Sequence, residues 1–371
     1  MRKYFLPSLL FILMVVALVT LKSIAPELLN KQVLAYFLGF LLFVSISQVN
    51  FNYFWKISPY LYWAINLVLF VLLLIGRVNR GIVAWIQLPF GLRFQPSQIA
   101  VALTALFLAK NFKDSGQRQQ QQVLSWQLLL KLLFLIILPA VLIILEPDFG
   151  TAAVFLVASA VFFIFNRLSW QQVLSFLSAI VISLVFLWSF VLADYQKARL
   201  SNFLLIGHSS QAISSDYRQE SSAAYNARQA LIAIGAGQFW GQGLGQGSQS
   251  HLKFLPERQT DFIFASFVEE WGFLGSILIL SLYFMLLLFI LYLTHLENNR
   301  GKQLYLLAVF MMLLVQIFIN IGMNLALLPI TGITLPFLSY GGSSILSFFL
   351  TLALVQRILL EQEKRASSIF Q

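Results

Sequence analysis

Ten long apolar runs limit what this chain can fold into. A helix needs roughly 17 to 25 predominantly apolar residues to cross about 30 Å of hydrocarbon, and in lipid the backbone polar groups must be satisfied within helices or closed barrels. We therefore predict an all-α, polytopic membrane protein with ten transmembrane helices. The predicted spans are Phe5–Leu21, Gln32–Val49, Tyr60–Ile75, Gln95–Lys110, Leu128–Leu145, Thr151–Asn166, Gln171–Ala193, Ser276–Thr294, Leu304–Leu325 and Ser344–Leu360.

The composition excludes the soluble enzyme classes. Of the 371 residues, 59% are hydrophobic and 10% are charged, whereas a soluble domain carries roughly 25% charged residues. The chain has no Cys and three His. Disulfide frameworks, thiol nucleophiles, iron–sulfur clusters and Cys-ligated zinc are therefore excluded.

The distribution of Lys and Arg predicts the orientation, because short cytoplasmic loops carry an excess of these residues. Ten spans place both termini on one side of the membrane. With the termini inside, the inner segments carry 13 basic residues, the short outer loops carry five, and six lie in a segment too long for the rule. We predict a multi-pass protein of the cell (cytoplasmic) membrane with both termini cytoplasmic.

One segment differs from the apolar spans. Residues 194–261 are rich in Ser, Gln, Gly, Tyr and charge, and we predict that they form one large extracytoplasmic loop within a single transmembrane domain of residues 1–371. The Gly-rich run Gly235–Gly247 follows no predicted strand, so it does not indicate a dinucleotide site. We expect a close-packed loop with a permissive backbone.

Four carboxylates are informative, because a charge at bilayer depth costs roughly 2.5 to 3.5 kcal/mol. Asp148, Asp261, Glu269 and Glu270 lie in or against apolar sequence near the predicted outer face. Asp148, in a tight turn, is interpreted first as a helix N-cap. Glu269 and Glu270 are interpreted first as a buried structural pair. For Asp261, at the end of the large loop, the local pattern leaves open both an N-cap and a catalytic or binding role.

Several longer motifs carry a family resemblance. The segments Gly245–Ala265, Glu269–Gly275 and Asn320–Ser344 are highly specific, and Pro147–Thr151 and Gln95–Ser97 complete the series. At these segments the chain resembles the SEDS family of bacterial cell-wall proteins, and within it the RodA (rod shape-determining) branch, which is related to FtsW and SpoVE.

The resemblance implies a peptidoglycan glycosyltransferase that polymerises lipid II into glycan strands at the outer face of the cytoplasmic membrane, for cell elongation and shape. It also implies a class B penicillin-binding transpeptidase as partner and dependence on a divalent cation, Mg²⁺ or Mn²⁺. In such enzymes the Asp of the Thr-Asp-Phe motif is required, so Asp261 becomes the catalytic candidate. Joining a GlcNAc 4-hydroxyl to C1 of the next MurNAc needs a base for the hydroxyl and cationic help for the departing diphosphate.

Substrate binding is assigned to charged and hydroxyl residues of the large loop and of the last loop motif. Arg and Lys side chains suit a diphosphate headgroup. No organic cofactor is expected, and no metal-ligand set can be identified in the sequence. The candidates are Arg199, Arg228, Lys253, Glu257, Arg258, Thr260, Ser339 and Tyr340.

The chain departs from the family pattern beside Gln95–Ser97. Relatives usually continue with Glu and, three residues later, Lys, but this chain has Gln98 and Val101. An i, i+3 ion pair facing a cavity can be lost as a unit, whereas losing one member strands a charge. Gln259, in place of the commoner His, is a milder departure. Two other functions stay open: a lipid II flippase and a non-catalytic scaffold for a penicillin-binding protein.

Overall fold

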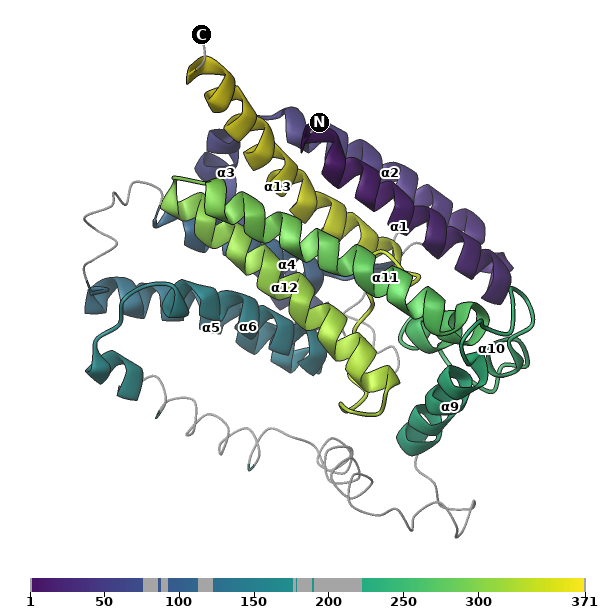
Figure 1. Ribbon diagram of the computed structural model, residues 1–371. Coiled ribbons are helices and arrows are strands. Elements are labelled where there is room, and N and C mark those ends of the chain that lie inside the picture. Colours follow the sequence, from purple (N-terminus) through teal and green to yellow (C-terminus); the bar gives the residue numbers. More distant parts are fainter. Residues whose placement is uncertain are drawn as a thin grey trace.

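The computed structural model describes residues 2–75, 86–87, 93–112, 123–175, 178, 189 and 222–369, which form a bundle of helices (Figure 1). The predicted all-α class is confirmed, and a two-residue antiparallel pairing of β1 (Ile86–Gln87) with β2 (Arg93–Phe94) is a minor addition. The helical elements are α1 (Arg2–Ile24), η1 (Pro26–Leu28), α2 (Leu29–Gln48), α3 (Phe51–Ile75), α4 (Pro96–Lys110), α5 (Trp126–Leu145), α6 (Phe149–Ile164), α9 (Ser222–Gly237), α10 (Ser248–His251), α11 (Ile263–Leu296), α12 (Arg300–Asn324) and α13 (Gly342–Ile369).

Helices match nine of the ten predicted spans within the described residues. Seven are long and apolar enough to cross a membrane: α1, η1 continued by α2, α3, α5, α11, α12 and α13. The shorter apolar helices α4 and α6 match two further spans. The remaining predicted span, Gln171–Ala193, lies largely outside the described residues, so the count of ten stays a prediction.

The predicted start of α3 was wrong. The helix begins at Phe51 rather than at Tyr60 and continues through Pro59. A proline inside a helix leaves the carbonyl four residues earlier without its amide donor. Here the Ser58 hydroxyl donates to the Trp55 carbonyl at 3.0 Å, so a neighbouring side chain replaces the missing hydrogen bond.

α11 extends well before the predicted span Ser276–Thr294. The helix begins at Ile263 rather than at Ser276, and Gly272 bends it with φ 67° and ψ −164°. Glycine adopts this backbone region without the steric cost that other residues meet. The bend therefore redirects the helix, and the acidic pair Glu269 and Glu270 lies on its first part.

α13 is the most deeply buried of the long helices, although it carries many polar residues. In Figure 1 it runs between the pair α1 and α2 and the helix α11. The Thr334 and Ser344 hydroxyls lie 2.8 Å apart and share a hydrogen bond. Against α2 the approach is close, because a Cβ on Gly39 would lie 2.2 Å from the Phe349 ring. Small residues permit such close helix packing in membranes.

The two ends of the bundle differ. The N- and C-termini lie toward one end, and α9 and α10 lie at the other (Figure 1). The Gln356 amide donates to the Lys3 carbonyl at 2.8 Å at the terminal end. At the opposite end, the Arg258 guanidinium donates to the Ile24 carbonyl. The described part of the large loop is therefore one bundle length away from the termini, as the predicted topology requires.

Single Cys probes in this Cys-free chain test the orientation. Leu252 is 66% exposed at the loop end, and Ser367 is exposed at the terminal end. We expect a membrane-impermeant maleimide to label Leu252→Cys in intact cells, and Ser367→Cys only after permeabilisation, because the basic residues place the termini inside. Labelling of both probes from the same side would contradict the topology.

Candidate active site

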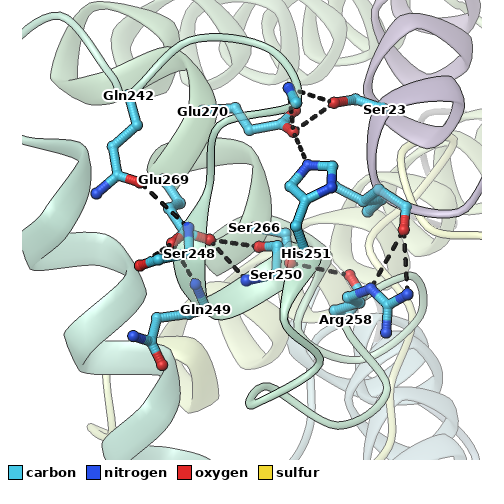
Figure 2. Close-up of polar contacts among 12 residues, drawn as sticks. Ser23, Gln242, Ser248, Gln249, Ser250, His251, Arg258, Ser266, Glu269 and Glu270 are labelled. Carbon is cyan, nitrogen blue, oxygen red and sulfur yellow. Dashed lines mark hydrogen bonds and ion pairs between the residues drawn. The ribbon is translucent and has the colours of Figure 1, made fainter.

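The carboxylate of Glu269 organises the loop before α11 (Figure 2). It is fully buried and accepts hydrogen bonds from the Gln249 amide at 2.7 Å, the Ser250 amide at 2.9 Å and the Ser250 hydroxyl at 2.5 Å. A buried carboxylate is tolerated when several donors satisfy it. Glu269 therefore fixes α10 against the start of α11.

Glu270 ties the same loop to α1 (Figure 2). Its Oε1 accepts from the Ser23 hydroxyl at 2.5 Å and the Gly245 amide at 3.2 Å, and it lies 3.0 Å from His251 Nε2. The side chain is 2% exposed. The interpretation of Glu269 and Glu270 as a buried structural pair is confirmed, and their partners are now named.

The Gly-rich run packs directly on α11, which confirms the close-packed loop. A Cβ on Gly241 would lie 2.1 Å from the Glu270 carbonyl oxygen, and one on Gly237 would lie 2.1 Å from the Val268 carbonyl oxygen. The Gln242 amide donates to the Glu269 carbonyl at 2.9 Å. The glycines thus allow two backbones to touch.

Two asparagines of α12 hold the backbone at Asp261. Asn320 Nδ2 donates to the Asp261 carbonyl at 3.0 Å and to the Ile333 carbonyl at 2.7 Å. Asn324 Nδ2 donates to the same Asp261 carbonyl at 3.0 Å. Both asparagines are fully buried. They were missed as functional residues from the sequence, although Asn320 begins one of the motifs that carry the resemblance.

The N-cap position of α11 falls one residue after Asp261. The N-cap residue of α11 is Phe262, and its side chain makes no capping hydrogen bond. Instead, Asn324 Oδ1 accepts from the Ala265 amide at 3.0 Å, one of the first-turn amides that a capping side chain usually satisfies. α12 therefore supplies a cap from outside the helix, and Phe262 rather than Asp261 occupies the N-cap position.

The last loop closes over this segment. The Ser339 hydroxyl donates to the Thr260 carbonyl at 2.7 Å, and the Tyr340 amide donates to the Gln259 carbonyl at 2.8 Å. From α2, Gln32 Nε2 donates to the Ser339 carbonyl at 3.3 Å. The structure thus brings the predicted residues Thr260, Ser339 and Tyr340 together beside Asp261.

Asp261 itself is half-buried at the junction of these elements. A Cβ built on Gly332 of the last loop would lie 3.8 Å from Asp261 Oδ2, so the carboxylate faces this glycine. Gly332 is exposed and has a φ of 76°. The last loop thus places a glycine, which has no side chain, next to a partly exposed carboxylate.

The other predicted binding residues differ in exposure and in their hydrogen-bond partners. Thr260 Oγ1 donates to Glu257 at 3.2 Å, and Lys253 is exposed. Arg258 binds the end of α1, as described above, so its guanidinium contributes to packing. Arg228 is half-buried on α9, and Arg199 lies outside the described residues.

A second carboxylate, Asp148, joins two of the sequence motifs. It is the N-cap of α6 and accepts from the Thr151 amide at 3.0 Å, so the cap interpretation is confirmed. It also accepts from Gln95 Nε2 at 2.6 Å and from the Ser97 hydroxyl at 3.4 Å. Burial raises the pKa of Asp148, and these hydrogen bonds oppose the rise.

The neighbouring Glu146 is fully buried, and neither of its carboxyl oxygens has a hydrogen-bond partner among the described residues. Burial raises the pKa of Glu146 to about 8, and the nearby charge of Asp148 adds to the rise. A buried acid without donors is more stable in its neutral form. No role for Glu146 is predicted from the sequence.

The described residues do not form a metal site of their own. No three His, Asp or Glu side chains gather among them. Mg²⁺ at phosphate sites often takes one or two carboxylates and completes its shell with water and phosphate oxygens. The chain thus lacks a dedicated ligand set in its described part.

Fold and site together define a multi-pass helical membrane protein with a half-buried carboxylate held between loops at the end opposite its termini. The profile of the FtsW, RodA and SpoVE family, described as cell cycle protein, matches residues 3–364. The chain belongs to this family, which confirms the SEDS resemblance.

Curated relatives match most of the chain. The peptidoglycan glycosyltransferase MrdB of Helicobacter pylori strain J99 is 33% identical over 350 residues, covering 94% of this chain and 87% of the relative. MrdB of Escherichia coli K12 is 30% identical, covering 90% and 85%. The probable peptidoglycan glycosyltransferase FtsW of Coxiella burnetii is 33% identical, covering 88% and 87%.

Solved structures share the fold. A chain from work on the structural coordination of polymerization and crosslinking by a peptidoglycan synthase complex has a TM-score of 0.77 at 27% identity, covering 96% of this chain and 97% of that chain. The rod shape determining protein RodA of Thermus thermophilus has a TM-score of 0.68 at 27% identity, covering 96% and 95%.

Two glycines of the loop provide a matched stability test. Gly241 and Gly245 both have positive φ, 83° and 78°, but only Gly241 faces backbone, and a Cβ on Gly245 would meet nothing within 4 Å. We expect Gly245→Ala to lower the free energy of unfolding by about 1 to 2 kcal/mol through backbone strain. Gly241→Ala should cost about 1 to 3 kcal/mol more through overpacking. Equal thermal unfolding midpoints for the two purified variants in detergent would contradict the close contact with α11.

Glu146 predicts a pH dependence of stability. Its folded pKa of about 8 lies above the ordinary value of 4.5, so the folded state binds more protons than the unfolded state between these values. Stability should therefore fall as the pH rises through this window, by at most about 1.4 kcal/mol per pH unit from this group. Glu146→Gln cannot ionise, and its unfolding midpoint should fall less than that of the native protein between pH 5 and about 8. Parallel profiles for the two proteins would show that Glu146 is ionised or solvated.

Proposed function

We propose that this chain is a peptidoglycan glycosyltransferase that polymerises lipid II at the outer face of the cytoplasmic membrane. Its membership of the FtsW, RodA and SpoVE family and the names of its curated relatives support the enzyme class. The placement of Asp261 between the large loop and the last loop carries the mechanistic part of the proposal.

Asp261 acts as the general base for the acceptor. It removes the proton of the GlcNAc 4-hydroxyl as the oxygen attacks C1 of the next MurNAc, and the bond from C1 to the undecaprenyl diphosphate oxygen breaks. A single inverting displacement requires no covalent enzyme intermediate. A positioned base contributes about 10² to 10⁴ in rate.

The surroundings suit a base. The asparagines Asn320 and Asn324 hold the Asp261 backbone, and Phe262 rather than Asp261 occupies the N-cap position of α11. In the preceding segment, Lys253 and Glu257 have φ values of 62° and 49°. Non-glycine residues in this region are uncommon and strained, and such strain concentrates at functional sites. The backbone of this segment is therefore strained at Lys253 and Glu257.

Cationic residues of the same loop bind the diphosphate in this proposal. Lys253 is exposed. Two residues later, the fully buried Leu255 side chain anchors the segment in the interior. Arg228 and Arg199 remain predicted contacts, whereas the donation of Arg258 to the end of α1 favours a role in holding the loop.

A class B penicillin-binding transpeptidase is the proposed partner. The structural similarity to a chain from a peptidoglycan synthase complex supports an assembly with a crosslinking enzyme. Dependence on Mg²⁺ or Mn²⁺ is a separate proposal that rests on the family resemblance, as does a role in elongation and cell shape.

Asp261→Asn tests the base. The amide keeps the size of the side chain and accepts hydrogen bonds but cannot take a proton. We expect polymerisation of labelled lipid II by the purified protein with its transpeptidase partner, measured as glycan ladders, to fall by about 10²-fold or more.

The matched control is Glu27→Gln, which neutralises an exposed carboxylate at the same end of the bundle. It should keep nearly native ladders. The unfolding midpoint and partner binding of Asp261→Asn should persist, because its backbone contacts do not change. Normal ladders from Asp261→Asn would remove it as the base. Ladders absent from the native protein itself would favour a flippase or a scaffold.

A further inference from the structure

An open cavity of about 710 Å³, lined mostly by polar and charged residues, lies at the terminal end of the bundle. Its walls come from the starts of α3 and α12 and from the last turns of α13. This end is remote from Asp261, and neither the proposed reaction nor the family motifs use it. The lining residues are Asn50, Asn52, Trp55, Asn298, Asn299, Lys302, Arg357, Glu361, Lys364 and Arg365.

The cavity has an excess of positive charge. Four cationic side chains and one carboxylate line it. Glu361 accepts from Lys302 Nζ at 2.5 Å and from Arg357 Nε at 2.9 Å, so a single carboxylate serves two buried cations. Arg365 lies 3.2 Å from Glu297, which is outside the lining. The carboxylates near the cavity therefore do not balance its cations.

Lys364 carries the remaining charge at the rim. It is exposed, and among the described residues its ammonium group has no ion-pair or hydrogen-bond partner. Four asparagine amides add neutral donors and acceptors around the same space. Several cations with amide donors in one cavity match the charge and the acceptor oxygens of a phosphate group.

We propose that this cavity binds the phosphate group of an anionic ligand, and that an anionic phospholipid of the adjacent leaflet supplies it. Basic pockets between transmembrane helices on the cytoplasmic side suit anionic lipid headgroups. A cavity of this size accommodates a small ligand. The ring of Trp55, which lines the cavity, lies 5.9 Å from Lys302 Nζ, and the fully buried ring of Phe51 lies 5.2 Å from it, so both rings help to hold this cation in place.

Native mass spectrometry of the purified full chain in detergent tests the proposal. We expect saturable binding of phosphatidylglycerol and weaker binding of phosphatidylcholine, whose headgroup has no net charge. Lys364→Glu should weaken phosphatidylglycerol binding about tenfold, because it removes one attraction and adds a repulsion. Asn52→Asp keeps the size of an exposed lining side chain and adds one negative charge. It should weaken phosphatidylglycerol binding about fivefold.

Lys56→Glu is the matched control, since Lys56 is exposed on the same helix as Asn52 but does not line the cavity. It should leave phosphatidylglycerol binding within about twofold of the native value, because its charge lies outside the pocket.

A parallel thermal-shift titration with inorganic phosphate separates the two sources of the anion. One outcome would support the phosphate site but reassign its source to a free anion. In that outcome Lys364→Glu weakens the binding of inorganic phosphate, and the native protein does not prefer phosphatidylglycerol over phosphatidylcholine. Equal effects of Lys364→Glu and Lys56→Glu, or no saturable binding of either probe, would overturn the proposal.

Discussion

The candidate active site depends on two buried amide side chains of α12. Asn320 and Asn324 both donate to the Asp261 carbonyl, and Asn324 also accepts from the Ala265 amide. Leaving a buried backbone group without its partner costs about 1 to 3 kcal/mol. Because these bonds join the end of the large loop, the start of α11 and α12, the place of the Asp261 carboxylate follows from the packing of two helices rather than from the loop alone.

The acidic pair on α11 gives the loop its second support. Glu269 satisfies the amides at the start of α10, while Glu270 binds Ser23 at the end of α1. Both carboxylates lie just before the bend at Gly272, where the Gly-rich run touches the helix backbone. The loop that contains Lys253 and Glu257 is therefore built on a bent helix, which provides the rigid support that a positioned base needs.

Much of this architecture was predictable from the sequence, for a physical reason. A run of about 20 apolar residues in a membrane has one stable solution, the helix, and the Asp148 cap involves an amide three residues away in the chain. The partners of Glu269 and Glu270 were not predictable, because Ser23 is 247 residues from Glu270. Asn324 lies within the motif Asn320–Ser344 but did not stand out by itself, since a neutral amide in an apolar run lacks the high insertion cost that singled out the carboxylates. The resemblance supplied the catalytic candidate, but only the structure placed Phe262, rather than Asp261, at the N-cap position of α11.

The two departures on α4, Gln98 and Val101, have different surroundings in the structure. Val101 is 3% exposed in the hydrophobic core, and the buried Gln98 Oε1 has no hydrogen-bond partner among the described residues. A lone Lys at position 101 would thus bury a cation beside a neutral amide, at a cost of several kcal/mol, so loss of both charges together is the tolerated change. The Asp148 carboxylate on the adjoining turn keeps its own donors, Gln95 and Ser97. The half-exposed Asp261 is held by α12 and the last loop, so its assignment as the base does not require charges at positions 98 and 101.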